Sequence, residues 1–548
     1  MSVNRAIDTE PGGWPGTCVE AASRALYDSG IRYVFGYPGG EVVDFIEALE
    51  CQGIDFILTG HESTAALMSG AIGRLTGRPG VCLATLGPGA CNLVLGVGCA
   101  YLDRDPVLAF SGAIASRRAH LSNKQNLNLV DMFAPLTKWS VSLTGIRTEQ
   151  TIRAAIGVTQ AHPRGPVYLS VPSDIAKDPD QREGAGLEPP ALPVSSDSQF
   201  DRVASGLNKA RRPVAVIGCG VDVERDTDPI RSFLSSSGIP FVVLPQAKGV
   251  ASEEGRMFMG TVTSAAGDKH IVESLNQSDF LLGIGFDPVE SYQDWHLRRP
   301  VFSLANGPTG FDAFRPEAEC IGDLAGLMKR LEDSFSGSSE WTPKEIEGLR
   351  RRVSESITPP VSSGTKGLSP YHVVSAVRES LPSSAVVTTG AGAHKMVMCQ
   401  AWPTNRPRSF LVSNGLSAMG FGFCAALAAS FIDRSGYVVA IIGDGEFAMM
   451  VQELETACRL GLRPLMLVLC DRSLAVIKIA QKNRGKPPRG VDFGSVDWVR
   501  VAQGFGAAGR RASTLVEVQQ AVEDWVKAPE LTVLEVPVDE SLYCGLDF

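Results

Sequence analysis

The sequence predicts an α/β protein with several doubly wound parallel sheets, and three observations lead to this prediction. Short apolar runs such as 81–85, 214–218 and 438–442 are bounded by glycine or proline, as buried parallel strands usually are. Helical stretches separate these runs almost throughout the chain, which favours β-α-β units. The 57 glycines are enough for many tight turns between strands and helices.

Chain length and two irregular stretches predict three domains. A length of 548 residues gives a prior of roughly three to four domains. Residues 174–199 and 334–367 lack the strand–helix rhythm and are rich in small, polar and turn-forming residues, apart from one basic helix inside the second stretch. Taking both as linkers, we place domains at residues 14–175, 198–333 and 368–545.

Composition excludes several classes of protein. Hydrophobic residues make up 44% of the chain and charged residues 20%, so a disordered protein is excluded. The net charge of −9 with no basic block disfavours nucleic acid as a partner. No apolar run reaches the roughly 20 residues that span a membrane, and the first 16 residues lack the order of a signal peptide. Because the 12 cysteines occur singly, we expect reduced thiols and a cytoplasmic protein.

The sharpest chemical signal lies in the third domain. The predicted strand 438–442 runs into Gly443-Asp444-Gly445-Glu446-Phe447, and the next strand, 465–469, is followed by Asp471. Both aspartates thus follow parallel strands, at the sheet edge where such proteins bind ligands. Glycines at this turn let the backbone approach a phosphate, and two carboxylates beside a phosphate suit Mg²⁺. An aspartate that merely caps a helix is the alternative for Asp444, but the second aspartate 27 positions later favours the metal site.

These residues resemble the cofactor-binding motif of a known family. Gly443-Asp444-Gly445 followed by Asp471 resembles the motif of thiamine diphosphate-dependent enzymes of the acetolactate synthase-like family, closest to the catabolic branch. The resemblance implies that Mg²⁺ is held by Asp444, Asp471 and the backbone carbonyl of Ser473. It also implies that the cofactor is bound by a set that includes Gly443, Asp444, Gly445, Glu446, Phe447 and Ser473.

The first domain carries a second group of family-like motifs. Residues 34–40, 60–66 and 85–92 resemble the pyrimidine-binding domain of these enzymes. The resemblance implies that Glu62 is the catalytic acid that contacts the cofactor, and that Pro38, Gly39 and Asn92 also bind it. Taken alone, Glu62 is equally consistent with a surface acid at a helix start, where the helix dipole favours negative charge.

Further matches extend the predicted site. Gly390 and His394 resemble the loop that meets the diphosphate. Met419 resembles the methionine that wedges beneath the cofactor and keeps it bent. Filling of the core is the usual role of a methionine, but the spacing of 25 positions to Asp444 favours the wedge.

Two polar residues complete the catalytic set that the resemblance implies. Gln125 lies twelve positions before a Thr-Lys pair, as does the glutamine that reaches the active site in acetolactate synthases. The preceding residue, Lys124, stands where the catabolic enzymes usually have histidine. We therefore expect Glu62, Gln125 and Lys124 to be the catalytic residues.

The middle domain contains half of a dinucleotide fingerprint. A predicted strand leads into Gly218-Cys219-Gly220, but a third glycine and a matching acidic residue are lacking. Some branches of the resembled family bind FAD in this domain. The likeness to the catabolic branch leaves FAD as an option that is not favoured.

The resemblance implies a carboligase, with alternatives that the residues leave open. Such an enzyme decarboxylates a 2-oxo acid, here pyruvate, and transfers the two-carbon unit to a carbonyl acceptor. It is a homodimer or homotetramer, because Glu62 of one subunit serves the cofactor held by Asp444 of another. The alternatives are a thiamine diphosphate-dependent decarboxylase or lyase, and a biosynthetic relative with another acceptor, which Ala480 in the acceptor region keeps open. Another alternative, from a different functional class, is a non-catalytic or regulatory relative or a nucleotide-binding oxidoreductase built on Gly218-x-Gly220.

Overall fold

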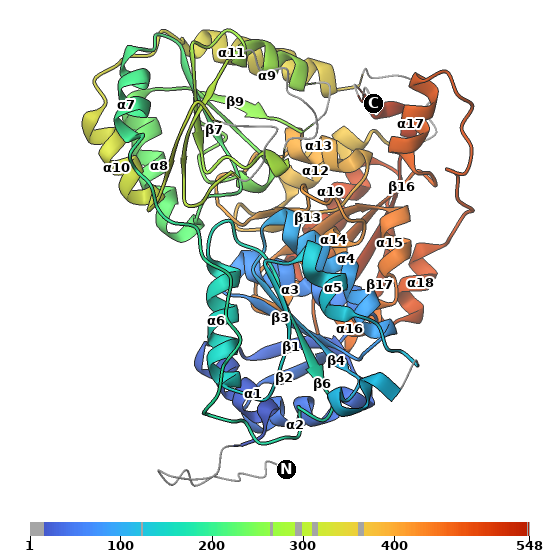
Figure 1. Cartoon of the computed structure of the whole chain (residues 1–548). Helices are drawn as coiled ribbons and strands as arrows, with labels where there is room; N and C mark the ends of the chain where they lie inside the picture. The colour runs from blue at the N-terminus through green and yellow to red at the C-terminus, as the bar shows by residue number, and fades with distance from the viewer. Residues whose placement is uncertain are drawn as a thin grey trace.

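The chain folds into three α/β domains, each built on a six-stranded parallel sheet (Figure 1). The computed structural model describes residues 16–121, 124–263, 267–290, 299–309, 316–359, 367–544 and 546. The predicted fold class is confirmed. The outer limits predicted for the first and third domains, residues 14 and 545, lie outside the described residues.

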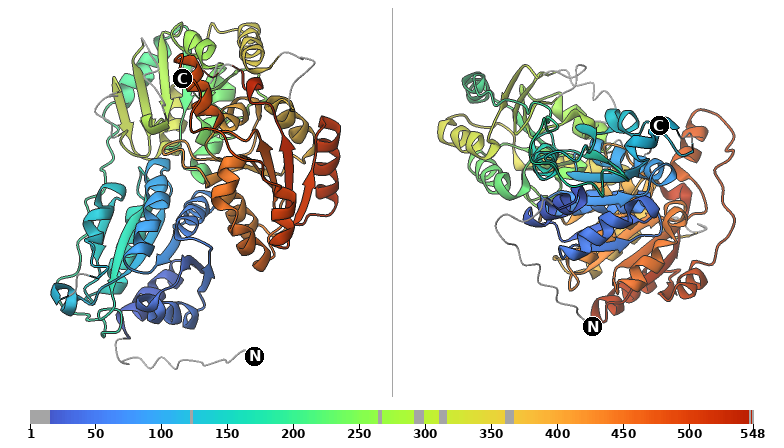
Figure 2. Two further views of the ribbon diagram at one scale, coloured as in Figure 1. Left: turned by 90° about the vertical axis from the view of Figure 1, so that its right-hand side faces the viewer. Right: turned by 60° about the horizontal axis from the view of Figure 1, so that its bottom comes forward.

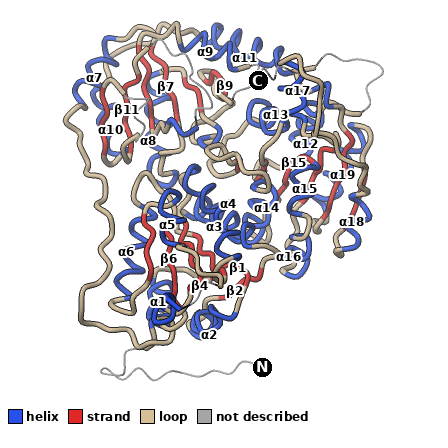
Figure 3. Tube along the Cα trace, turned by 45° about the vertical axis from the view of Figure 1, so that its right-hand side comes forward, coloured by secondary structure: helices blue, strands red, loops and turns tan. Residues whose placement is uncertain are grey.

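In the N-terminal domain the strands lie in the order β2-β1-β3-β4-β6-β5, all parallel. The strands are β1 (Tyr33–Tyr37), β2 (Asp55–Leu58), β3 (Gly80–Ala84), β4 (Val107–Ala113), β5 (Trp139–Ser142) and β6 (Val167–Pro172). The helices are α1 (Cys18–Asp28), α2 (Val43–Cys51), α3 (Glu62–Thr76), α4 (Pro88–Asp103), α5 (Leu129–Phe133) and α6 (Thr148–Gln160). After β6 an extended segment, the predicted linker, runs along the outside of the molecule to α7 (Figure 3).

The middle domain has the strand order β12-β11-β10-β7-β8-β9. Strands β7 to β9 follow one another toward one edge of the sheet and β10 to β12 toward the other, so the strand order reverses between β7 and β10. Its strands are β7 (Pro213–Ile217), β8 (Phe241–Val243), β9 (Phe258–Thr261), β10 (Phe280–Ile284), β11 (Val301–Ala305) and β12 (Ala318–Ile321). Its helices are α7 (Phe200–Lys209), α8 (Val223–Ser237), α9 (Asp268–Leu275), α10 (Leu324–Ser334) and α11 (Pro343–Ile357). Helix α11 is the basic helix expected in the second linker, and it packs against α9 and β9.

The C-terminal domain has the strand order β14-β13-β15-β16-β18-β17. Its strands are β13 (Val386–Thr389), β14 (Phe410–Val412), β15 (Val438–Gly443), β16 (Leu465–Cys470), β17 (Ala508–Arg511) and β18 (Thr532–Pro537). Its helices are α12 (Pro370–Ser380), α13 (Ala393–Ala401), α14 (Phe421–Ile432), α15 (Asp444–Met450), α16 (Glu453–Arg459), α17 (Ala475–Asn483), α18 (Trp498–Gly504) and α19 (Leu515–Lys527). Counted in chain order, the strands of this sheet are arranged as in the N-terminal domain.

Each domain contacts the other two (Figure 2). The N-terminal and C-terminal domains meet through α3 and α14, which pack on each other. Both helices are buried on almost all sides, because each lies between its own sheet and the helix of the other domain. Among the described residues, no helix combines the length and the apolar character that crossing a membrane requires.

The packing of α3 on α4 depends on a glycine. A Cβ atom at Gly96 of α4 would lie 2.9 Å from the backbone nitrogen of Leu67 and closer still to the Ala66 side chain, both in α3. We therefore expect Gly96→Val to force the two helices apart and to lower the free energy of unfolding by about 3 kcal/mol.

Thermal and urea unfolding of the two glycine variants provide the measurement. The matched control is Gly157→Ala in α6, where a Cβ would meet nothing within 4 Å. That change should instead stabilise the protein by up to about 1 kcal/mol, because alanine has the higher helix propensity. Equal unfolding midpoints for the two variants would contradict the packing argument.

Candidate active site

Two aspartates follow neighbouring central strands of the C-terminal sheet. Asp444 comes directly after β15 and Asp471 directly after β16, and these strands pair in parallel. The Asp444 carboxylate accepts a hydrogen bond from the backbone N–H of Arg472 at 2.9 Å. The Asp471 carboxylate accepts from the backbone N–H of Ser473 at 2.8 Å and from its hydroxyl at 3.1 Å. The turn after β16 therefore fixes both carboxylates.

The two carboxylates share an unfavourable electrostatic environment. Burial, followed by the charge of Asp471, raises the pKa of Asp444 to about 6. Burial also raises the pKa of Asp471. A divalent cation beside them would relieve this cost, because it places opposite charge next to both carboxylates. The donor set, carboxylates with the nearby Ser473 carbonyl, is the hard oxygen type that Mg²⁺ prefers.

A buried histidine and glutamate lie next to this pair. Oε1 of Glu446 accepts hydrogen bonds from the backbone N–H groups of Gly420 (3.1 Å) and Gly422 (2.9 Å). Its other oxygen, Oε2, lies 3.6 Å from Nε2 of His394, and neither atom has a hydrogen-bond partner in the described structure. Any side chain at Gly390 would collide with the Glu446 carboxylate. Buried polar atoms without partners indicate a place where a polar ligand belongs.

A cavity of about 270 Å³ brings most of these residues together. Its lining includes the predicted residues His394, Met419, Gly443, Asp444, Gly445, Glu446, Asp471 and Ser473. Phe447 is not among them: its ring lies in the core, near the rings of Phe423 and Trp498. The lining also includes Lys395, Ile477 and Tyr543, which the sequence analysis did not single out.

The second group of predicted residues lies at the carboxyl edge of the N-terminal sheet. Glu62 begins α3, is 8% exposed, and accepts a hydrogen bond from the side-chain amide of Asn92 at 2.9 Å. Pro38 and Gly39 follow β1, and Gly39 lies against the side chain of Thr85. The structure therefore brings Glu62 and Asn92 into direct contact and places Pro38 and Gly39 at the same edge.

The predicted polar pair, Lys124 and Gln125, belongs to a loop near this edge. A Cβ at Gly87, in the turn after β3, would lie 3.1 Å from the Cβ of Gln125. Gln125 has a φ of 58°, which is uncommon for a residue with a Cβ. The side chains of both Lys124 and Gln125 are exposed.

Among the residues that the structure describes, the two groups do not meet within one chain. Every residue that lines the 270 Å³ cavity belongs to the C-terminal domain. Glu62 instead lies on the N-terminal domain, whose neighbouring turn contacts α16: the backbone N–H of Gly60 donates to Glu453 at 2.9 Å. A single copy of the chain therefore presents two separate half-sites.

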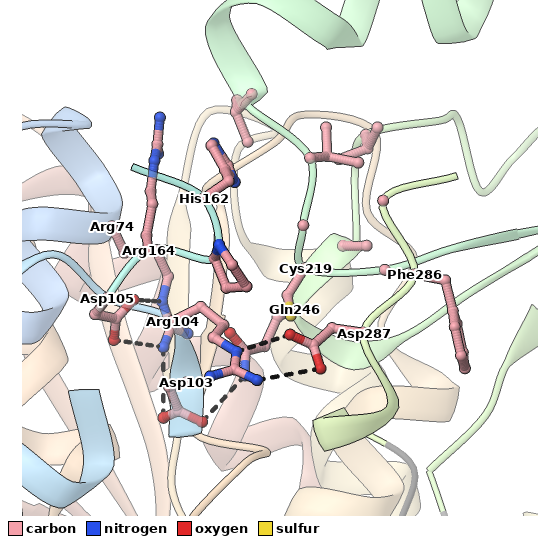
Figure 4. Close-up of a pocket in the computed structure, with 18 of the residues that line it drawn as sticks. Arg74, Asp103, Arg104, Asp105, His162, Arg164, Cys219, Gln246, Phe286 and Asp287 are labelled. Atoms are coloured by element: carbon pink, nitrogen blue, oxygen red, sulfur yellow. Dashed lines mark hydrogen bonds and ion pairs between the residues drawn. The ribbon is translucent and has the colours of Figure 1, made fainter. Parts of the chain in front are cut away.

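The crevice after β7 and β10 is already filled by the protein's own groups. The backbone N–H groups of Cys219 and Gln246, which a nucleotide phosphate would need, donate to the carboxylate of Glu290 at 2.8 and 2.9 Å. Arg104 forms an ion pair with Asp287 across the crevice (Figure 4). The remaining space is about 70 Å³, well below a cofactor pocket. These residues do not fit FAD.

Comparison with family models decides the relationship. The model described as "Thiamine pyrophosphate enzyme, N-terminal TPP binding domain" matches residues 17–132, the central-domain model matches 200–331, and the C-terminal TPP binding domain model matches 390–536. The chain belongs to the thiamine pyrophosphate enzymes. The resemblance found in the motifs is thereby confirmed at the level of all three domains.

Individual members of this family match along nearly the whole chain. An acetolactate synthase of Bacillus subtilis is 29% identical over 94% of this chain and 92% of its own length. A catabolic acetolactate synthase of Raoultella terrigena is 28% identical, with 94% and 93% covered. The large subunit of acetolactate synthase isozyme 2 of Escherichia coli is 29% identical, with 94% of each chain covered. Within the thiamine pyrophosphate enzymes, the chain is acetolactate synthase-like.

The two aspartates should set the affinity for Mg²⁺. We expect Asp444→Ala and Asp471→Ala each to raise the Mg²⁺ concentration needed for thiamine diphosphate binding at least about tenfold, because each removes a charged oxygen ligand. Asp471→Asn should lose much less, since an amide oxygen remains. Mg²⁺ titration of the metal-free protein with the cofactor, followed by tryptophan fluorescence or calorimetry, measures this.

The control for this series is Asp492→Asn. Asp492 pairs with Lys478 at 2.8 Å and its side chain is exposed, so the change removes a nearby charge but no proposed ligand. It should leave the Mg²⁺ requirement unchanged. If Asp492→Asn had the same effect as Asp471→Ala, general electrostatics rather than ligation would explain both.

Proposed function

We propose that the protein is a thiamine diphosphate- and Mg²⁺-dependent carboligase that decarboxylates pyruvate and transfers the two-carbon unit to an acceptor carbonyl, with a second pyruvate as the first acceptor to test. The observation that carries this proposal is the pair of buried Asp444 and half-buried Asp471 beside the unpartnered atoms of His394 and Glu446, in a chain that belongs to this enzyme family. The acetolactate synthases among its relatives support the reaction type.

The residues of the C-terminal cavity have distinct proposed roles. Asp444, Asp471 and the Ser473 carbonyl hold Mg²⁺, and His394 donates a hydrogen bond to the diphosphate. Met419 lines the same cavity and would pack against the bound cofactor. When bound, thiamine diphosphate supplies the carbon nucleophile and accepts the electrons that loss of CO₂ releases.

The N-terminal half-site supplies proton handling. Glu62, oriented by the Asn92 amide, holds a proton at the edge of the cofactor's aminopyrimidine. Gln125 and Lys124 reach the substrate side from the neighbouring loop. Ala480, on α17 one turn beyond the cavity-lining Ile477, leaves room for the acceptor.

Completing the site requires a second copy of the chain. Exposed large apolar side chains flank both half-sites: Tyr37 and Leu58 near Glu62, and Met449, 48% exposed, on the helix that begins with Asp444. Such side chains are typical of surfaces that a partner covers. We propose a homodimer or a tetramer built from such dimers, in which Glu62 of one subunit faces Asp444 of the other.

We also propose that the enzyme works in the cytoplasm. All 12 cysteines are free thiols and none forms a disulfide, which suits a reducing compartment. Its substrates are small oxo acids and carbonyl compounds.

Product analysis tests the reaction. With pyruvate, thiamine diphosphate and Mg²⁺, we expect acetolactate, identified by mass spectrometry, and no dependence on added FAD. Adding a panel of other 2-oxo acids, aldehydes and ketones should reveal further acceptors by competing for the same donor. Acetaldehyde as the sole product would instead identify a decarboxylase.

Mixing two inactive variants tests the shared site. Glu62→Gln should lower kcat by about 10²–10⁴-fold, because it removes the proton-holding group. Asp444→Ala should abolish cofactor binding at ordinary Mg²⁺ concentrations. In a mixed dimer, one site combines the intact Glu62 with the intact Asp444, so co-refolded or co-expressed variants should regain part of the wild-type activity.

The control is each variant mixed with itself, which should stay inactive. Absence of recovery in a verified mixed dimer would place Glu62 and Asp444 of the same chain in one site and refute the proposed arrangement.

A further inference from the structure

The loop that carries Met419, residues 413–419, is anchored in another domain. The backbone N–H groups of Asn414 and Gly415 donate to Oδ1 of Asp103 at 3.0 and 2.7 Å. Asp103 is the last residue of α4 in the N-terminal domain and is 2% exposed. Because water does not reach this carboxylate, its hydrogen bonds to the loop cannot be replaced by solvent.

The middle domain joins the same contact. The side-chain amide of Gln246 donates to Oδ1 of Asp103 at 3.0 Å (Figure 4). Its backbone N–H donates to the Glu290 carboxylate, and the Glu290 carbonyl accepts from the side chain of Asn414 at 3.1 Å. The middle domain therefore holds the loop directly through Glu290. It also holds the loop indirectly, because Gln246 bonds to the Asp103 carboxylate that the loop amides contact.

The C-terminal domain supplies a buried amine. Lys395, on α13, is 1% exposed, and its Nζ donates to the Ser417 hydroxyl at 2.7 Å and to the Ser413 carbonyl at 3.2 Å. Ser417 has a φ of 56°, in the left-handed region that residues with a Cβ rarely adopt. This conformation lies two residues before Met419, so the loop depends on its surroundings for its shape.

We propose that Asp103 is a positioning residue of the active site: through the amides of Asn414 and Gly415 it fixes the loop that presents Met419 to the cofactor cavity. Glu290 and Lys395 complete the hold from the other two domains. The inference rests on the proposed function, and it assigns to an acid of the N-terminal domain a role in a cavity that this domain does not line.

The groups that surround the Asp103 side chain explain why a carboxylate is needed at this position. Oδ1 of Asp103 receives three donors, while Oδ2 lies 3.2 Å from the Cys99 thiol and 3.5 Å from the guanidinium of Arg74. Both oxygens thus face donors. An asparagine would bring its own NH₂ group against one of these sets, so Asp103→Asn loses hydrogen bonds while keeping the size of the side chain.

The experiment compares Asp103→Asn with Glu253→Gln. Glu253 is an equally buried carboxylate that also joins two domains, but its bonds go to Lys248 and to the Thr404 backbone. Both changes should lower the thermal midpoint. Only Asp103→Asn should speed hydrogen exchange of the Asn414 and Gly415 amides in the cofactor-free protein, measured by mass spectrometry.

With thiamine diphosphate and Mg²⁺ bound, Asp103→Asn should lower kcat about 10- to 100-fold with a smaller change in KM for pyruvate, because a displaced Met419 alters the cofactor rather than substrate binding. The circular dichroism of the bound cofactor should change in parallel. Glu253→Gln should retain the wild-type kcat and spectrum.

If Asp103→Asn left the hydrogen exchange of the loop amides and kcat unchanged, the proposal would be overturned. It would also be overturned if kcat fell in both variants only in proportion to their thermal midpoints. If Asp103→Asn does not fold, Lys395→Met tests the same loop from within the C-terminal domain and should show the same kcat loss and spectral change; wild-type values for it would refute the proposal. Failure of the proposed function looks different, because the wild-type protein itself would then neither bind the cofactor nor consume pyruvate.

Discussion

The carboxyl edge of the C-terminal parallel sheet brings two acidic side chains close together, and burial together with their mutual repulsion makes their charged forms costly. Asp444, which is buried, and Asp471, which is half-buried, lie next to each other because β15 and β16 are adjacent and each is followed at once by its aspartate. The same edge carries His394 and Glu446, whose facing atoms lack protein partners. A divalent cation held beside these carboxylates would relieve this cost, which is why the proposed Mg²⁺ site belongs here.

The N-terminal and C-terminal sheets have the same strand order, and both use the same edge. In one domain the edge presents Glu62, and in the other it presents Asp444. This likeness is not visible in the sequence, since strand order depends on which strands become neighbours, and local patterns do not encode this. The structural likeness suits the proposed arrangement, in which each domain contacts one end of the cofactor.

Local motifs led to most of the predicted site residues, and the structure places many of these around one cavity. Asp444 and Asp471 were identifiable because a strand, a turn and an acid lie together in the sequence, and Glu62 because its motif is equally compact. Phe447 shows the limit: the motif predicts that it contacts the cofactor, but its ring lies in the core, because burial of an aromatic side chain is strongly favourable. Asp103, Glu290 and Lys395 gave no signal, because their partners lie more than a hundred residues away or depend on loop shape.

The mutual burial of α3 and α14 has a consequence for motion during turnover. Separating the N-terminal and C-terminal domains would expose a helix that is apolar around nearly its whole circumference, at a high cost in solvation. These two domains therefore move as one rigid body and do not open and close about a hinge between them. Admission of reactants and escape of products then fall to the short segments around the cavity mouth, where α17 keeps Ile477 in contact with water.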